Sequence, residues 1–422
     1  MTSFVLAAPY GLDSTMRFVA AAASLSGVDL GVVSHEPPEA FLAKLDAGDR
    51  SRVKGFAQVS DVVDPDQLEV GVRRVAPQLG GRVDALDGIL EPLQESLAEV
   101  RQRLGIRGMD RAEARRFRDK AHMKETLRAA GLPCARHRLA TSGDEALAFA
   151  DEVLPIVAKP PAGAGAIDTF RIDRRDQLEG WVRATPPTVE RPLLLEEFIQ
   201  GDEYSFDSVT VGGEHVFHSI SRYAPTPLQV MRSPWIQWTV LLPRSIDGPE
   251  FSPIAETGPK ALRVLGMVTG MSHMEWFRRA DGSIAISEVA ARPPGAQITS
   301  LLSYAHDHDF YRAWAELAAF GTFDPPPRSY ATGAAYLRGQ GQGRVLTVDG
   351  IDDIRDELGP LVVESRLPRP GQPKASGYEG EGYVILRHPE TEVVADGLRR
   401  LVSRLQVHLD GDGAERDRGD RR

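Results

Sequence analysis

Cysteine is almost absent from this sequence. Cys134 is the single cysteine in 422 residues, so no disulfide can form within the chain. This composition suits a reducing compartment, and we expect a cytoplasmic protein. Cys134 follows Pro133 just beyond a predicted helix end, where we expect a small packed residue rather than a reactive thiol.

Long hydrophobic runs are also missing. No segment approaches the roughly 20 apolar residues that a membrane-spanning helix needs. The first residues include a short apolar run, Phe4 to Pro9, but lack the charged segment and apolar core of a signal peptide. We therefore expect neither membrane insertion nor secretion.

Positive charge is not in excess. The chain has 60 acidic and 50 basic residues, a formal net charge of −10. A general nucleic-acid binder usually carries a basic face, so we predict no nucleic-acid partner. The Gly-x-Gly-x-x-Gly pattern is absent after the first predicted strand, which disfavours NAD binding.

The length exceeds that of one ordinary domain, and we predict several lobes. Apolar runs at 3–9 and 28–34 flank a predicted helix at 15–26, and this strand–helix–strand order predicts a parallel sheet. The predicted units are an N-terminal βαβ domain (1–110), a central domain (111–323), a C-terminal α+β lobe (324–409) and a charged, disordered tail (410–422).

Two local patterns position the candidate residues of the central domain. Residues 111–130 are strongly helical in composition and stop at Gly131, which predicts one continuous helix. Strand-like runs at 272–277 and 283–289 flank Asp281-Gly282, a typical β-hairpin turn.

A lysine followed by a glycine-bearing loop is the first candidate site. Lys159 ends an apolar strand-like run, and Gly163 and Gly165 follow it. Glycines let backbone N–H groups approach phosphate oxygens, and the lysine supplies positive charge. The pattern indicates a phosphate-binding cover, although a plain turn after a strand looks similar. Lys120, taken alone, is expected to belong to a solvated helix face.

Two glutamates are the main candidates for a metal site. Glu275 and Glu288 each lie at or near a strand end, on the two arms of the predicted hairpin, so they can face each other on adjacent strands. Like charges so placed repel unless a cation lies between them. Hard carboxylate oxygens suit Mg²⁺, with Mn²⁺ as an alternative. Two unrelated exposed glutamates are the competing interpretation.

Further polar residues fall near these glutamates. Arg292 follows Glu288 closely and is placed to neutralise a transferred phosphoryl group. Glu203, just after Gly201, is placed to accept the protons of ribose hydroxyls. His273 is expected to support the site or to pack in the core rather than bind a ligand.

The cluster at 306–309 suggests a transition-metal site, because it contains two histidines and two aspartates. It directly precedes a predicted helix at 310–320. Capping of that helix by Asp307 or Asp309 is therefore the preferred interpretation.

The order of these residues along the chain resembles that of the ATP-grasp superfamily and, within it, of the carboxylate–amine ligases. The ordered features are Lys120, Lys159 with its glycine loop, Glu196 to Glu203, Glu275, and Glu288 to Arg292. The resemblance spans roughly residues 118–295. It implies an α/β (α+β) ATP-grasp fold with an N-terminal Rossmann-like βαβ lobe, a nucleotide lid at about 119–195 and a small C-terminal lobe.

The resemblance also implies a role for each site residue. Lys120 and Lys159 contact the nucleotide phosphates, and the loop with Gly163 and Gly165 closes over them. Glu203 binds the ribose. Adenine lies along a segment that contacts it largely through backbone groups, namely Glu196, Glu197, Phe198 and Ile199.

At the phosphoryl end, the resemblance implies that Glu275 and Glu288 hold Mg²⁺ and that Arg292 contacts phosphate. One position departs from the usual family pattern. Ala290 stands where many members have an asparagine ligand, so a second magnesium ion would lack one usual ligand.

The implied activity is that of an ATP-dependent ligase. ATP phosphorylates a carboxylate, an amine attacks the acyl phosphate, and ADP and phosphate are released, with Arg292 and Lys159 as catalytic residues. Two alternatives stay open: a biotin-type or purine-pathway ATP-grasp carboxylase, and a non-catalytic ATP-binding regulatory module.

The carboxylate and amine substrates are not readable from the sequence. Arg222, Arg232 and Arg244 lie between the ribose and metal motifs, and one of them is a candidate to clamp a substrate carboxylate. For any single one of them, a solvated surface arginine is the expectation. A homodimer is the default oligomeric state by base rates.

Overall fold

The computed structural model describes residues 1–162, 169–233 and 236–413. The loop with Gly163 and Gly165 lies outside the described residues, as does most of the predicted tail. Helices occur together with parallel and antiparallel sheets, in agreement with the predicted α/β (α+β) class.

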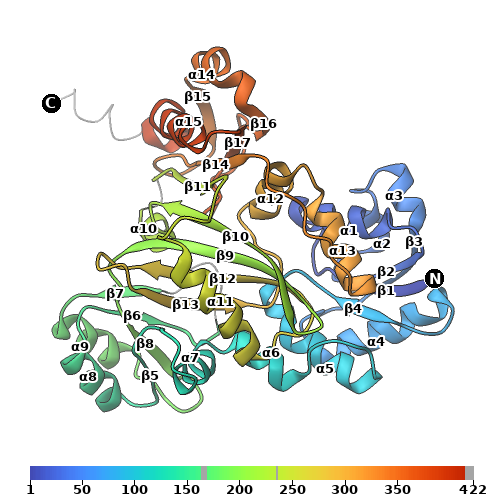
Figure 1. Cartoon of the computed structure of the whole chain (residues 1–422), viewed down its shortest axis with the longest axis horizontal. Coiled ribbons are helices and arrows are strands. Elements are labelled where there is room, and N and C mark those ends of the chain that lie inside the picture. The colour runs from blue at the N-terminus through green and yellow to red at the C-terminus, as the bar shows by residue number, and fades with distance from the viewer. Residues whose placement is uncertain (163–168, 234–235, 414–422) are drawn as a thin grey trace.

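The N-terminal part contains a four-stranded parallel sheet in the order β3-β2-β1-β4 (Figure 1). Its strands are β1 (Thr2–Ala7), β2 (Val28–Ser34), β3 (Val53–Gln58) and β4 (Ala85–Asp87). Its helices are α1 (Asp13–Ala23), α2 (Pro38–Leu42), α3 (Ala47–Arg52), α4 (Pro65–Val75) and α5 (Gln94–Leu104), with the short turns η1 (Ala76–Leu79) and η2 (Glu91–Leu93). Because β1 pairs in parallel with both β2 and β4, the predicted βαβ start is confirmed.

The predicted single helix over 111–130 is wrong in one respect. It is divided into α6 (Arg111–Arg118) and α7 (Lys120–Ala129) by Asp119, whose backbone is extended and whose side chain accepts hydrogen bonds from the N–H groups of Ala121 and His122. Aspartate favours such a cap over a helix interior because its short side chain competes for backbone N–H groups. Lys120 thereby starts a new helix, and its N–H donates to the carbonyl of Pro161 at 3.0 Å.

A separate antiparallel sheet follows, in the order β5-β8-β6-β7. It consists of β5 (His137–Ala140), β6 (Ile156–Lys159), β7 (Phe170–Ile172) and β8 (Leu193–Glu197), with α8 (Gly143–Glu152) and α9 (Arg175–Ala184). The helices and strands share one apolar core. This unit, at the lower left of Figure 1, lies within the range predicted for the nucleotide lid.

The largest sheet has eight strands in the order β13-β12-β9-β10-β11-β14-β17-β16. Its first five members are β9 (Asp202–Val211), β10 (Glu214–Ala224), β11 (Trp238–Leu242), β12 (Gly270–Arg278) and β13 (Ile284–Ala290). The helices of this region are α10 (Pro227–Arg232), α11 (Ser252–Leu265), α12 (Ile298–His306) and α13 (Phe310–Phe320). The predicted hairpin is confirmed, since β12 and β13 pair antiparallel and Gly282 adopts a φ of +83° in their turn.

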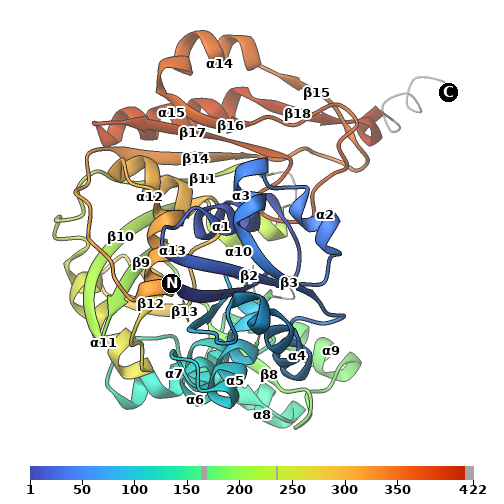
Figure 2. The same cartoon turned by 90° about the vertical axis from the view of Figure 1, so that its right-hand side faces the viewer.

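The C-terminal segment extends this same sheet. The strands β14 (Ala331–Leu337), β16 (Val362–Arg366) and β17 (Gly382–His388) continue it from β11 (Figure 2). The remaining elements are β15 (Val345–Asp349), β18 (Gln406–Leu409), α14 (Ile351–Leu358), α15 (Thr391–Arg404), η3 (Gly359–Leu361) and η4 (Asp410–Gly413). The proposed boundary near residue 324 therefore separates strands of one shared sheet.

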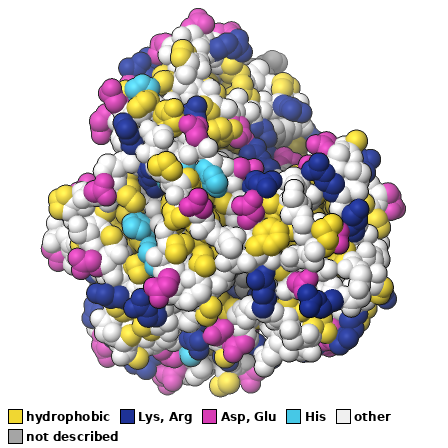
Figure 3. Space-filling model, turned by 45° about the vertical axis from the view of Figure 1, so that its right-hand side comes forward, with side chains coloured by type: hydrophobic (Ala, Val, Ile, Leu, Met, Phe, Trp, Pro, Cys, Tyr) yellow, Lys and Arg dark blue, Asp and Glu magenta, His cyan; other side chains and the backbone are white. Residues whose placement is uncertain are grey.

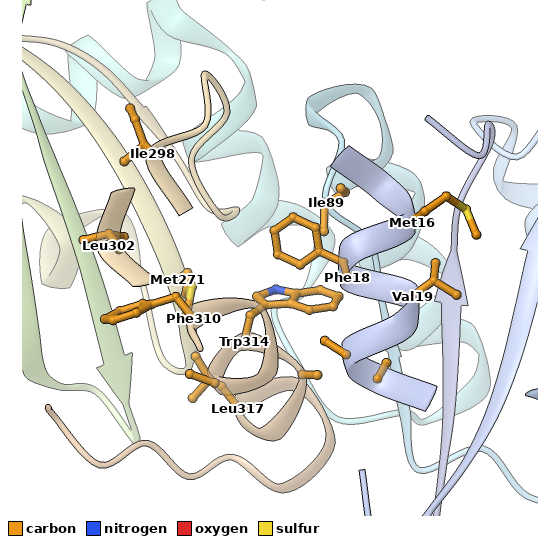
Figure 4. Close-up of a cluster of buried hydrophobic side chains, with 14 of the residues drawn as sticks. Met16, Phe18, Val19, Ile89, Met271, Ile298, Leu302, Phe310, Trp314 and Leu317 are labelled. Carbon is orange, nitrogen blue, oxygen red and sulfur yellow. The ribbon is translucent and has the colours of Figure 1, made fainter. Parts of the chain in front are cut away.

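Aromatic packing joins the N-terminal part to the rest of the molecule. Phe18 of α1 and Trp314 of α13 are in edge contact, with ring centroids 5.0 Å apart and planes at 83° (Figure 4). Such a pair contributes about 0.5–1.5 kcal/mol beyond its buried area. Asp309 caps α13 as predicted, by accepting hydrogen bonds from the N–H groups of Tyr311 and Arg312.

No helix among the described residues is long and apolar enough to cross a membrane. On the face shown in Figure 3, acidic and basic side chains are interspersed.

Candidate active site

A cavity of about 450 Å³ brings the predicted site residues together. Its walls come from the β5-β8-β6-β7 sheet, the start of α7, the large sheet and the segment after β13. Ten predicted residues lie within the described structure, and all ten line this cavity: Lys120, Lys159, Glu196, Glu197, Phe198, Ile199, Glu203, Glu275, Glu288 and Arg292.

Glu275 and Glu288 are direct partners across the β12–β13 pair. The Nζ of Lys120 lies 2.8 Å from the Oε1 of Glu288. Burial opposes ionisation of Glu288, but the charges of Lys120 and Lys159 outweigh it, so the pKa of this carboxyl is lowered. Glu288 is therefore an anion at the point where α7, β6 and the large sheet meet.

The carboxylates at this end of the cavity fit a divalent cation. Burial, followed by the charge of Glu275, raises the pKa of Glu203 well above its usual value. A bound cation relieves such repulsion. No group of three or more acidic, histidine or cysteine side chains in the described part of the chain is arranged as a metal cage. The donor set is thus two facing glutamates, which matches the way Mg²⁺ binds one or two carboxylates plus nucleotide phosphates.

Glu196 is held between two lysines. Its Oε1 lies 2.8 Å from the Nζ of Lys124, and its Oε2 lies 3.0 Å from the Nζ of Lys159. Burial would raise the pKa of Glu196, but the two lysines lower it to about 2. The Glu196 side chain therefore positions Lys159, and this contact adds to the adenine role that the resemblance implied.

Lys124 was missed by the sequence reasoning. Its side chain is fully buried, pairs with Glu196 and also donates to the carbonyl of Ser287. The available signal was its spacing from Lys120, one helical turn earlier on the same face of α7.

Glu196→Gln should destabilise the protein by about 3–5 kcal/mol at neutral pH, because it leaves the buried Lys124 without its counter-charge. The pKa of Glu196 is lowered in the folded state, so its contribution is present above its usual value of 4.5 and is lost as pH falls toward about 2. Urea unfolding across this range should show the difference between wild type and variant narrowing below pH 4.5. Glu197→Gln is the control and should cost under about 1 kcal/mol, since Glu197 pairs with partly exposed arginines. A pH-independent difference between wild type and Glu196→Gln would contradict the assignment.

Arg292 is oriented by a residue from the N-terminal part of the chain. Its Nε donates to the Oε2 of Glu91 at 2.6 Å, and Glu91 belongs to η2. Burial alone would lower the pKa of Arg292, but Glu91 more than compensates and raises it. Sequence reasoning missed Glu91, since nothing local in the chain marks a tertiary partner from another domain.

The segment predicted to meet adenine lines the cavity at the end of β8. The guanidinium of Arg171 stacks over the Phe198 ring, 4.0 Å from its centroid. The N–H groups of Glu197 and Phe198 already donate to the carbonyls of Arg136 and Pro155, both at 2.9 Å. Any backbone contact that these two residues make with a base must therefore come from their carbonyl groups.

His273 supports the site from inside the sheet. Its Nδ1 lies 2.6 Å from the Oδ1 of the buried Asp207, and its Nε2 lies 3.7 Å from Glu275. Burial lowers the pKa of His273, but Asp207 outweighs burial and raises it to about 9.

The side chains of the 306–309 cluster are used within the fold. His306 faces the carbonyls of Pro326 and Pro327, and Asp309 caps α13.

Solved structures decide the fold. No protein-family model matches the chain. An L-amino acid ligase from Bacillus licheniformis superposes with a TM-score of 0.75 at 18% identity, covering 97% of this chain and 99% of that one. The chain has the ATP-grasp fold. A carboxyaminoimidazole ribonucleotide synthase from Aspergillus clavatus, solved with ATP, also shares the fold, with a TM-score of 0.68, 17% identity and coverage of 95% and 98%.

Curated relatives confirm the predicted likeness to ATP-grasp carboxylate–amine ligases. An L-arginine-specific L-amino acid ligase of Bacillus subtilis is 28% identical over 231 residues, which is 52% of this chain. The chain spans 55% of that relative's length. The cavity lined by the predicted site residues lies between the β5-β8-β6-β7 sheet and the large sheet.

Proposed function

We propose that this ATP-grasp protein uses ATP to join a carboxylate to an amine through an acyl phosphate. A free carboxylate reacts poorly with an amine, because its leaving group would be oxide. One carboxylate oxygen attacks the γ-phosphorus, and the bond from that phosphorus to ADP breaks. The amine nitrogen then attacks the acyl carbon, phosphate leaves, and the nitrogen loses a proton.

A single observation carries the proposal: one cavity is lined by two facing glutamates and by two lysines that are suited to bind phosphate groups. Lys120 is ion-paired to Glu288 and Lys159 to Glu196, so each lysine is held at a fixed place in the wall. Curated relatives named as an L-arginine-specific L-amino acid ligase and an alanine–anticapsin ligase support the ligase interpretation.

The chain's own residues supply binding and charge stabilisation. Lys120 and Lys159 bind the phosphates, Glu203 binds the ribose, and Phe198 and Ile199 cover the base. Arg292, fixed by Glu91, faces the transferred phosphoryl group, where negative charge redistributes in the transition state. No nucleophilic side chain is needed.

Magnesium belongs to this proposal as the cofactor of the nucleotide. Glu275 and Glu288 are the residues that would hold it, with Mn²⁺ as a substitute. When bound, the ion neutralises phosphate charge. The proposed partners are ATP, a small carboxylate and a small amine. A cytoplasmic location and a homodimer stay predictions.

ADP release tests the proposal. The purified protein is supplied with ATP, Mg²⁺ and pools of amino acids and small carboxylic acids, together and separately. We expect ADP release that requires both a carboxylate and an amine, with the amide product seen by mass spectrometry. ADP release that depends on bicarbonate would favour a carboxylase. Tight ATP binding without turnover across the whole panel would favour a regulatory module.

A further inference from the structure

One side of the active-site cavity is apolar and rich in aromatic rings. We call this side the aromatic wall, and its residues come from β10, α10, β11, the segment after β13, α12 and the segment between β16 and β17. They are Tyr223, Leu228, Trp238, Ala296, Ile298 and Tyr378. None of these side chains is charged at neutral pH, whereas the metal and phosphate residues described above are all ionisable.

Trp238 is the centre of the aromatic wall. Its ring makes edge contacts with Tyr223, at 6.0 Å between centroids and 75° between planes, and with Tyr378, at 5.7 Å and 80°. Trp238 also stacks on Tyr336, with centroids 4.5 Å apart and planes at 18°. Such contacts hold aromatic rings in place, so the wall is a preformed surface.

Tyr378 reaches the cavity from the C-terminal part of the chain. It lies on a segment, 374–381, that is anchored on both sides of it. The indole Nε1 of Trp238 donates to the carbonyl of Tyr378 at 2.7 Å. The buried carboxylate of Glu381 accepts hydrogen bonds from the N–H groups of Gly339 and Ala375, both at 2.8 Å. The Tyr378 ring is therefore held at a fixed place in the wall.

The fold does not use the hydroxyl group of Tyr378. Within the described ranges this hydroxyl makes no hydrogen bond with another residue, whereas that of Tyr336 donates to the carbonyl of Ala296. Burial raises the pKa of Tyr378 to about 12, so the phenol is neutral at neutral pH. The side chain of Tyr378 is thus available to a bound molecule, and it offers that molecule an uncharged aromatic ring.

The aromatic wall begins beside the phosphoryl end of the cavity. Gly295 follows Arg292 by three residues, and a Cβ added to Gly295 would lie 3.3 Å from the hydroxyl oxygen of Tyr378. The charge of Arg292 also acts on the pKa of Tyr378, in the direction opposite to burial. A carboxylate held for phosphorylation beside Arg292 therefore has the wall next to it, where the rest of its molecule must lie.

We propose that the aromatic wall binds an apolar side chain of the carboxylate substrate, and that Tyr378 is a residue that determines specificity for it. The proposal rests on the ligase function above and names its substrate class: acids with an aromatic or large aliphatic group. An apolar group gains free energy when it leaves water for such a surface, whereas a charged group without a partner loses free energy there.

A competition assay tests this assignment. The protein receives ATP, Mg²⁺, the amine that gives the highest ADP release, and an equimolar pair of acids that differ only in a benzyl against a methyl side chain. The pair is phenylalanine and alanine if amino acids are activated, and 3-phenylpropanoate and propanoate if simple acids are. Mass spectrometry with fragmentation measures how much of each acid is on the acyl side of the product. This ratio gives the ratio of kcat/KM values, whatever fraction of the protein is active.

We expect wild type to prefer the benzyl acid by about 10- to 100-fold, as for burial of an aromatic ring. In Tyr378→Ala this preference should fall by about 10-fold, with ADP affinity unchanged. Tyr378→Phe keeps the ring and should retain the preference. Leu228→Ala, at another part of the wall, should lower it by a smaller factor. Tyr10→Ala is the control, because Tyr10 is exposed and does not line the cavity, and it should behave as wild type.

Three results would overturn the assignment while the ligase function stands. They are a wild type that uses the methyl acid at least as well as the benzyl acid, an unchanged preference in both Tyr378→Ala and Leu228→Ala, and an equal loss of preference in Tyr378→Phe and Tyr378→Ala. If no acid gives a product with any amine, the ligase function fails and this assignment fails with it.

Discussion

Glu288→Gln should lower kcat by about 10³-fold or more while the protein stays folded. Glutamine preserves the shape of the side chain but removes the negative charge. Two functions are lost together. Glu288 no longer completes the acidic pair with Glu275, and it no longer holds Lys120, whose Nζ lies 2.8 Å from it. ADP release at saturating ATP and Mg²⁺ measures the effect.

The control for this variant is Glu214→Gln. Glu214 begins β10, is exposed and does not line the cavity, so its substitution should leave turnover unchanged. Thermal unfolding of both variants separates a catalytic loss from a folding loss. Unimpaired turnover in Glu288→Gln would contradict the metal-binding role assigned to this residue.

Arg292→Gln is the second large effect, and we expect kcat to fall by about 10²- to 10³-fold with little change in ATP affinity. The reason is that Lys120 and Lys159 bind the phosphates of the ground state, whereas Arg292 acts on charge that redistributes during transfer. Initial rates give kcat, and titration with ADP gives nucleotide affinity.

Glu91→Gln separates the charge of Arg292 from its orientation. The guanidinium remains, but its 2.6 Å hydrogen bond to a carboxylate is weakened, so we expect a smaller loss of about 10-fold. Arg244→Gln, outside the cavity, is the matched arginine control. A comparable loss of nucleotide affinity and kcat in Arg292→Gln would instead indicate that Arg292 mainly binds the ground state.

Several residues that line the cavity could be predicted from the sequence because each carries a local signal. Lys159 ends an apolar strand, and Glu275 and Glu288 stand on the two arms of a hairpin whose turn is readable from Asp281-Gly282. Their pairing follows from the period of a β-strand, and the structure places them as direct partners.

Other features of the site and fold could not be predicted, mostly because they depend on contacts between residues far apart in the chain. Lys124 reads as one more charge on a helix, and only the folded chain brings it to Glu196. Glu91 contacts Arg292 from a position about 200 residues earlier in the chain. The division of the predicted helix at Asp119 was not expected, because the residues on both sides of Asp119 favour helix. The capping preference of this one aspartate outweighs their helix propensity. The shared sheet of the central and C-terminal parts rests on the pairing of β11 with β14, which no local pattern specifies.

The most direct test of the metal and nucleotide site is Mn²⁺ binding followed by electron paramagnetic resonance, with ADP present, in wild type and in a Glu275→Gln/Glu288→Gln double variant. We predict that wild type takes up Mn²⁺ in an ADP-dependent manner and that the double variant does not. Equal ADP-dependent uptake of Mn²⁺ by the two proteins would contradict the account.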